Sequence, residues 1–99
     1  MPKCINLDGL TFNDVLLVPG YSTFSKENAD LTTNLHKKIR LSIPVISSPM
    51  DQVTETDMAI AMAENGGLGI IHRNLTIDDQ ITMVSAVKKY KSSLLVGAA

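Results

Sequence analysis

The feature that most constrains the fold of this chain is a regular alternation of short apolar runs and longer amphipathic segments after Pro44. The apolar runs cover residues 45–48, 68–72 and 94–99, and each has the length of a buried strand. The segments between them carry helix signals. Consecutive short strands linked by helices favour parallel pairing with right-handed crossovers. We therefore expect an α/β fold in the order strand, helix, strand, helix, strand.

Both expected helices have recognisable ends. Thr54 followed by Asp57 resembles a capping box, and Gly66-Gly67 would end the first helix. Thr76 with Asp79 predicts the start of the second helix, which ends among lysines that suit the negative end of a helix dipole. The apolar residues that should face the sheet are Met58, Ala61 and Met62 in the first helix and Ile77, Ile81, Val84 and Val87 in the second.

Upstream of these elements, an apolar period of two predicts an antiparallel β-hairpin with a polar tip at His36-Lys37-Lys38. Residues 10–20 begin with a candidate cap at Thr11 and end in a Pro-Gly turn signal, so we expect a short helical turn or an extended segment there. A polar loop should follow over residues 21–28. The alternating residues of the hairpin are Leu31, Thr33 and Leu35 in one strand and Ile39, Leu41 and Ile43 in the other.

Composition argues against several classes of function. Nine Lys and Arg residues nearly balance ten Asp and Glu residues, and a net charge of −1 disfavours a nucleic-acid-binding surface. The apolar runs are too short to span a membrane, and residues 1–6 lack the apolar core of a secretion signal. The single cysteine, Cys4, cannot close an internal disulfide, and no base or helix start near it favours a catalytic thiol. We expect a cytoplasmic protein whose partners are neither nucleic acid nor membrane.

Two folds begin with this order of elements, a doubly wound sheet and a (β/α)8 barrel. A complete barrel needs roughly 250 residues, so this chain would form only the opening part of one. Three strands and two helices cannot cover both faces of a sheet. We therefore expect either a fragment of a barrel or a chain that completes its core against another chain.

In both folds, ligands bind at the carboxyl ends of the strands. Three segments of the chain should therefore share one rim, namely residues 47–51, 72–74 and 97–99. We expect Ser48, Met50 and His72 to gather around one mouth at this rim. A carboxylate, two hydroxyls, a thioether, an imidazole and a guanidinium would be available there for binding or chemistry.

The residues of this rim also have simpler interpretations. Neither His36 nor His72 has the Cys or His spacing of a zinc site, so no metal site is predicted. Gly66-Gly-Leu-Gly69 follows a helix, whereas a dinucleotide-binding fingerprint follows a strand. In the simpler interpretations, Ser48 is a turn residue, Met50 fills core space, Asp51 is favoured by a helix dipole, His72 is a hydrogen-bonded structural histidine and Arg73 is a surface charge.

Five blocks of the sequence resemble, in order and spacing, the N-terminal part of the inosine-5′-monophosphate (IMP) dehydrogenase family. They are Leu10-Thr-Phe-Asn-Asp-Val-Leu-Leu-Val-Pro19, Ile43-Pro-Val-Ile-Ser-Ser-Pro-Met-Asp51, Val53-Thr-Glu55, Met58-Ala-Ile-Ala-Met-Ala63 and Gly66-Gly-Leu-Gly-Ile-Ile-His72. The second and fifth blocks together are specific. The likeness covers nearly the whole chain from residue 10, and GMP reductase is the nearest related family.

The resemblance implies a (β/α)8 barrel that oxidises IMP to XMP with NAD. In that family a cysteine attacks C2 of the purine, hydride passes to NAD, and water hydrolyses the covalent intermediate. Potassium supports the cysteine loop, and the enzyme is a tetramer. The resemblance places the cysteine, the potassium site and the NAD-contacting residues beyond residue 99, so this chain alone should not turn over IMP. Carried over, Ser48 and Met50 would bind the substrate, with Met50 near the purine, and Asp51, His72, Arg73 and Asn74 would lie near the site.

The chain departs from the family pattern at a few places. Asn13 stands where Asp is usual and Gln52 where Thr is usual, but neither change removes a reacting group. Most members carry a paired regulatory CBS module after the second helix, whereas residues 88–93 here run straight into the last apolar run. We therefore expect residues 1–99 to be the N-terminal part of a catalytic barrel without that module. Two alternatives stay open: a GMP reductase, which deaminates GMP with NADPH, and a non-catalytic partial barrel that oligomerises or binds a partner.

Overall fold

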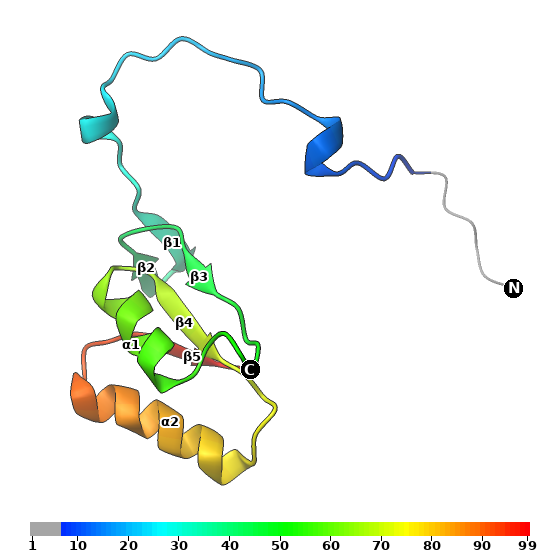
Figure 1. The fold of residues 1–99 in the computed structure, drawn as a ribbon. Helices are drawn as coiled ribbons and strands as arrows, with labels where there is room; N and C mark the ends of the chain where they lie inside the picture. Colours follow the sequence, from blue (N-terminus) through cyan, green and yellow to red (C-terminus); the bar gives the residue numbers. More distant parts are fainter. Residues whose placement is uncertain (1–6) are drawn as a thin grey trace, which may run out of the picture.

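The computed structural model describes residues 7–99 (Figure 1). Cys4 lies outside the described residues. Within them, no helix is long and apolar enough to cross a membrane. The elements are the 3-10 turns η1 (Phe12–Asp14) and η2 (Lys26–Asn28), the strands β1 (Thr33–His36), β2 (Ile39–Leu41), β3 (Ile46–Ser47), β4 (Leu68–Ile71) and β5 (Val96–Ala98), and the helices α1 (Thr56–Glu64) and α2 (Ile77–Tyr90).

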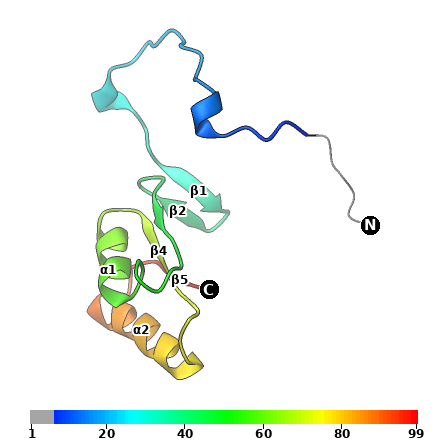
Figure 2. The same ribbon diagram turned by 45° about the vertical axis from the view of Figure 1, so that its right-hand side comes forward.

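Strands β3, β4 and β5 form a parallel sheet in that order, which confirms the predicted parallel pairing. Ser47 pairs with Gly69, and Gly69 pairs in turn with Val96. Helices α1 and α2 connect the strands and pack beside them (Figures 1 and 2). The predicted order of strand, helix, strand, helix, strand is therefore present in a mixed α/β unit.

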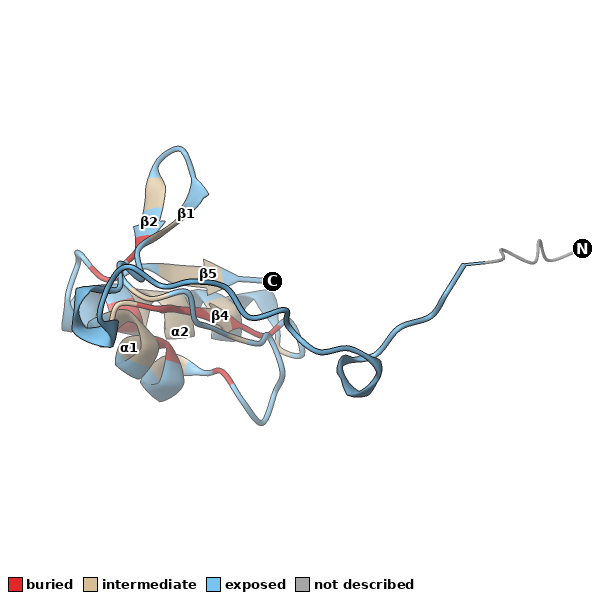
Figure 3. Ribbon diagram, turned by 90° about the horizontal axis from the view of Figure 1, so that it is seen from above, coloured by how far each residue is buried: buried red, intermediate tan, exposed pale blue. Residues whose placement is uncertain are grey.

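The core lies between the two helices and the sheet, where most of β4 is buried (Figure 3). Ile71 of β4 is completely buried. Ala59 of α1, Val87 of α2 and Leu94 are buried around it. Burying a side chain of the size of Val87, Leu94 or Ile71 stabilises the fold by about 1.5–3 kcal/mol. The residues packed against this cluster are Ile60, Ala63, Leu75, Met83, Val84 and Val96.

The predicted apolar stripe of α1 is wrong at two of its three positions, and only Met62 is half-buried. Met58 is 41% exposed and Ala61 is exposed, whereas Ala59 is completely buried. Residues 58–63 are all apolar, so the sequence does not single out one face. The buried face is instead set by Gly69 of β4, where the missing side chain lets the backbone of α1 approach the sheet through Ala59.

The start of α1 also differs from the prediction. The helix begins at Thr56 with Glu55 as its N-cap residue, so Thr54 belongs to the preceding loop. The start of α2 is as predicted, because the hydroxyl of Thr76 accepts a hydrogen bond from the backbone amide of Asp79 at 3.1 Å.

The predicted stripe of α2 is half right. Val84 and Val87 face the core, but Ile77 is 79% exposed and Ile81 is 56% exposed. The buried arc of the helix is centred between Met83 and Val87, and the two isoleucines lie beyond its edge. Adjacent faces of a helix both show spacings of three and four residues. The apolar pattern therefore predicted the approximate face of α2 that is buried but not its centre.

Strands β1 and β2 form the predicted antiparallel hairpin, although its pairing is shorter than the predicted alternation. Residues 37–38 make the turn, and His36 belongs to β1 instead of the tip, because the register shifts just before it. The backbone amides of Ser42 and Ile43 donate to the carbonyl of Gly66 at 2.9 and 3.2 Å. The hairpin is thereby attached to the end of α1.

The end of α1 is the glycine turn that the sequence predicts. Gly66 has a φ of +88°, in the left-handed region that favours glycine. Its amide donates to the carbonyl of Ala63 at 3.1 Å, and the amide of Gly67 donates to the carbonyl of Met62 at 2.9 Å. This pair of bonds is a Schellman motif, and it returns the chain directly into β4.

Residues 7–32 extend away from the α/β unit, and all of them are exposed (Figures 1 and 2). The turn η1 confirms the helical turn predicted after Thr11. The backbone amide and the hydroxyl of Thr11 each donate to Asp14 Oδ2 at 2.8 Å, and these bonds lower the pKa of Asp14. The structure thus combines both predicted options, a short turn followed by extended chain.

A polar contact joins the two helices, because the hydroxyl of Tyr90 donates to Glu64 Oε1 at 3.0 Å. This bond first, and the charge of Glu64 second, raise the pKa of Tyr90 above its ordinary value of 10.0. Because the folded-state pKa is raised, the stabilisation is present below the ordinary pKa and is lost as the pH rises through the raised one. We expect Glu64→Gln to move the tyrosinate absorbance titration of Tyr90 to lower pH, with Tyr90→Phe identifying the signal. A titration that Glu64→Gln leaves in place would contradict this contact.

Candidate functional site

The loops that follow β3, β4 and β5 lie at one edge of the sheet, because the three strands are parallel. Ser48 follows β3, His72 follows β4 and Ala99 follows β5. The side-chain amide of Asn74 donates to Asp51 Oδ2 at 3.2 Å and so joins the first two loops directly. The exit loops therefore share one edge, while a binding role for their side chains stays a prediction.

His72 is only 3% exposed, and its ring links two segments at this edge. Its Nε2 lies 2.9 Å from Glu55 Oε1, and its Nδ1 accepts a hydrogen bond from the backbone amide of Asn74 at 3.1 Å. Because Nδ1 acts as an acceptor, the ring proton is on Nε2, which donates it to Glu55. The ring is thus a hydrogen-bonded link between the start of α1 and the β4 exit loop, with both nitrogens engaged.

Gln80 of α2 ties the next pair of strands together in a similar way. Its side-chain amide donates to the carbonyl of His72 at 3.1 Å and to the carbonyl of Ala99 at 2.9 Å. Sequence reasoning missed Gln80, since a glutamine in an amphipathic helix usually faces solvent. Its place one turn before Val84, on the inner side of α2, was the only available signal.

Thr54 is the second residue that sequence reasoning misplaced, and it is completely buried. Its hydroxyl donates to the carbonyl of Ser48 at 2.7 Å and lies 2.8 Å from the hydroxyl of Ser47. Its backbone amide donates to the carbonyl of Met50 at 3.0 Å. The capping-box pattern hid this role, because the same residue types occur in a polar loop that precedes a helix.

Ser48 and Met50 lie exposed on the β3 exit loop, and Arg73 lies exposed on the β4 exit loop. These three predicted site residues are accessible to a ligand. Asp51 and Asn74 are bonded to each other, so they hold the loops together and offer a ligand only their remaining polar atoms. The rim therefore combines accessible side chains with a fixed frame.

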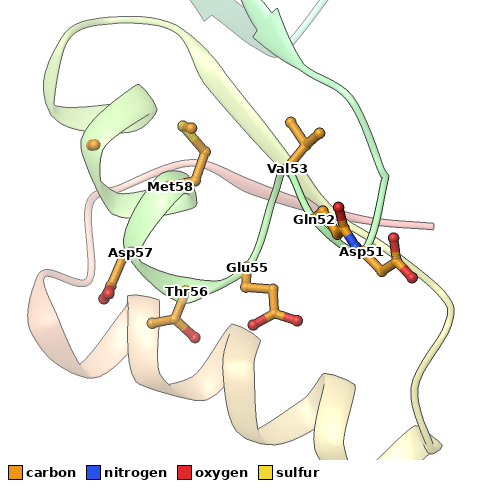
Figure 4. Close-up of a pocket in the computed structure, with 8 residues that line it drawn as sticks. Asp51, Gln52, Val53, Glu55, Thr56, Asp57 and Met58 are labelled. Atoms are coloured by element: carbon orange, nitrogen blue, oxygen red, sulfur yellow. The ribbon is translucent and has the colours of Figure 1, made fainter.

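An open depression of about 570 Å³ lies beside the rim, against the first turn of α1 (Figure 4). Three of its side chains are the carboxylates of Asp51, Glu55 and Asp57, which would repel a phosphate group. Within residues 7–99, no group of three His, Cys, Asp or Glu side chains is placed to hold a metal ion. The other lining residues are Gln52, Val53, Thr56, Met58 and Ala61.

Residues 9–99 match the family described as IMP dehydrogenase / GMP reductase domain. The inosine-5′-monophosphate dehydrogenase of Haemophilus influenzae is 50% identical over 91 residues, which are 92% of this chain and 19% of that protein.

Two further relatives carry the same name. The protein of Korarchaeum cryptofilum is 53% identical over 85 residues, 86% of this chain and 18% of its own length. The protein of Mycobacterium leprae is 47% identical over 94 residues, 95% of this chain and 18% of its own length. The chain thus spans less than a fifth of the length of these curated relatives. Because the family match covers nearly all of its residues, the chain belongs to the IMP dehydrogenase / GMP reductase domain family, of which it represents an N-terminal portion.

Proposed function

We propose that this chain forms the opening part of a (β/α)8 barrel in an enzyme that oxidises IMP to XMP. The observation that carries the proposal is the 50% identity, over 91 residues, to a protein named inosine-5′-monophosphate dehydrogenase. The consecutive parallel order of β3, β4 and β5, with a helix in each connection, supports it, because this is the repeating unit of such a barrel.

We propose further that this part of the barrel has no regulatory module inserted in it. In relatives of this family the CBS module is expected after the second helix. Here α2 ends at Tyr90 and β5 begins at Val96, so residues 91–95 alone connect them. A connection of this length is typical of α/β units and leaves no room for a further domain.

In this proposal Ser48 and Met50 contact the nucleotide. The hydroxyl of Ser48 would donate to or accept from an oxygen of the ligand, and the flexible thioether of Met50 would pack against the purine. Arg73 adds a positive charge at the same edge, which would attract an anionic nucleotide. Asp51 and Asn74 would keep the two loops in place around it.

The oxidation itself would depend on groups outside the described residues. When bound, NAD would accept the hydride from the purine, and potassium is expected to support the loop of the cysteine nucleophile. Residues 7–99 contain no cysteine and no cluster of three side chains suited to a metal ion. We therefore assign this portion a role in substrate binding and none in nucleophilic attack.

We also propose that the chain works as part of an assembly in the cytoplasm. Within residues 7–99, β3 and β5 each pair on one side only, so the sheet offers two edges to further strands. The predicted partners are IMP, the rest of the barrel, in the same polypeptide or as another chain, and further copies in a tetramer.

Activity measurements separate the candidate functions. A complete barrel enzyme that carries residues 1–99 unchanged is expected to form NADH from IMP and NAD. Consumption of NADPH with GMP would instead identify a GMP reductase. An assembly that is stable by light scattering but inactive in both assays would leave the non-catalytic partial barrel.

Ser48→Ala is expected to weaken IMP binding by about 0.5–1.5 kcal/mol, the usual net value of one neutral hydrogen bond. The measurement is the KM for IMP from initial rates in the complete enzyme. Ser92→Ala is a matched control, because Ser92 is exposed in the connection that leads into β5. Unchanged KM and kcat in Ser48→Ala would show that Ser48 is only a turn residue.

A further inference from the structure

The β3 exit loop is held by a dense set of hydrogen bonds that converge on two carbonyl groups. The carbonyl of Ser48 accepts from the hydroxyl of Thr54 at 2.7 Å and from the amide of Met50 at 2.8 Å. The carbonyl of Met50 accepts from the amides of Val53 and Thr54 at 2.9 and 3.0 Å. Thr54 is therefore the one residue that bonds to both Ser48 and Met50.

The hydroxyl of Thr54 is fully used in this arrangement. It has a single hydrogen, and the carbonyl of Ser48 can only accept, so that hydrogen goes to Ser48. The hydroxyl of Ser47, 2.8 Å away, then supplies the hydrogen of the second bond. Removing the oxygen of Thr54 would take the side-chain donor away from the Ser48 carbonyl. Because Thr54 is completely buried, water has no direct access to the position of its hydroxyl.

Packing fixes the position of Thr54 itself. The residue is completely buried, and its methyl group lies 3.3 Å from the point that a Cβ on Gly69 would occupy. Its neighbour Glu55 bonds to His72 on the next exit loop. Thr54 is thus held between the β3 exit loop and β4, which ties the loop to the rigid part of the unit.

We propose that Thr54 is a positioning residue, which fixes the backbone of Ser48 and Met50 so that their side chains meet the substrate. This inference rests on the proposed function, because it concerns how that site binds its nucleotide. Preformed geometry is valuable in such a loop, since a misplacement of about 1 Å can cost up to a hundredfold in rate.

The test is Thr54→Val in a complete barrel enzyme that carries residues 1–99. Valine keeps the shape of threonine and removes the hydroxyl, so the loop loses its link while the packing is retained. We expect the KM for IMP to rise by roughly twofold to tenfold, because a misplaced loop loses contacts such as the one that Ser48→Ala removes directly. The KM for NAD should change much less, because the loop is proposed to contact only the nucleotide substrate.

Three control variants separate positioning from stability. Thr54→Ser keeps the hydroxyl, loses the methyl group, and should restore a KM near that of the wild type. Thr82→Ala removes an exposed hydroxyl that bonds only to Asp78 within α2, away from the loop, and should also keep the KM. Val87→Ala lowers stability in the core, away from the loop, and should leave the KM unchanged.

The possible results are distinct. A wild-type enzyme without activity on IMP would overturn the proposed function and this inference with it. An active wild type whose KM is unchanged in Thr54→Val would overturn this inference alone. If Thr54→Val does not fold, Thr54→Ala replaces it, because Thr54→Ala and Thr54→Ser differ only in the hydroxyl oxygen. Equal KM values for those two variants would then overturn the inference.

Discussion

Replacing Gly69 with alanine is expected to destabilise the chain by about 3 kcal/mol, the upper part of the usual range for overpacking a core. A Cβ at this position would lie 2.6 Å from the Cα of Ala59 and 3.1 Å from its Cβ. The near atom is backbone of α1, which cannot rotate away as a flexible side chain would. The helix must therefore shift as a body and loosen the contact of Ala59 with Ile71. Urea denaturation of the chain measures the change.

Gly20→Ala is the matched control for this substitution. A Cβ on Gly20 would meet no atom within 4 Å, and Gly20 lies in the exposed segment before the hairpin. Its effect on the free energy of unfolding should stay within about 0.5 kcal/mol. If Gly69→Ala were as mild as Gly20→Ala, the close packing of α1 on β4 would be incorrect.

His72→Ala is expected to lower the free energy of unfolding by about 2–4 kcal/mol, from the cavity and the two lost hydrogen bonds together. The imidazole is buried, so its removal leaves space beside β4. The amide of Asn74 loses its acceptor, whereas Glu55 is half exposed and can be solvated in place of its lost partner. The loss should therefore come mainly from the cavity and the Asn74 amide.

Two variants test that assignment. His72→Asn places a side-chain oxygen near the position of Nδ1 and should recover part of the stability by accepting from the Asn74 amide. Arg73→Ala changes an exposed neighbour on the same loop and should be nearly neutral. A His72→Ala protein as stable as Arg73→Ala would show that the ring does not link the loops.

The parts of the fold that could be predicted from sequence are those with local causes. The end of α1 followed from Gly66, whose positive φ few other residues adopt readily. The start of α2 followed from Thr76 and Asp79, which bond to each other within one turn. The parallel sheet followed from the order of its elements, since short strands that alternate with helices favour parallel pairing.

The parts that could not be predicted depend on contacts between distant residues. The buried face of α1 is decided by the approach of Ala59 to Gly69, and residues 58–63 are all apolar, so they do not single out one face. The role of Thr54 depends on where the β3 exit loop turns back. A capping pattern describes a residue's neighbours along the chain and carries no information about that turn.

The candidate site shows the same division. The shared edge of the exit loops was predictable, because topology alone places the ends of parallel strands together. The bond between Asn74 and Asp51 joins residues 23 positions apart, and no sequence pattern predicts it. The engagement of both ring nitrogens of His72 was not predictable either, since it depends on the Glu55 side chain from another loop.

The three parallel strands lie in the sheet in the same order as in the chain, and this order indicates at which edge the next strand would be added. Because β4 is already paired on both sides, a further strand must join at β3 or β5, and in a barrel of the proposed kind the next strand joins beyond β5. Each strand is rotated relative to the previous one, so the sheet curves as strands are added. The last strand added is thereby brought back toward β3. The unpaired side of β3, with the exposed Ile46, is therefore the seam at which such a sheet would close on itself.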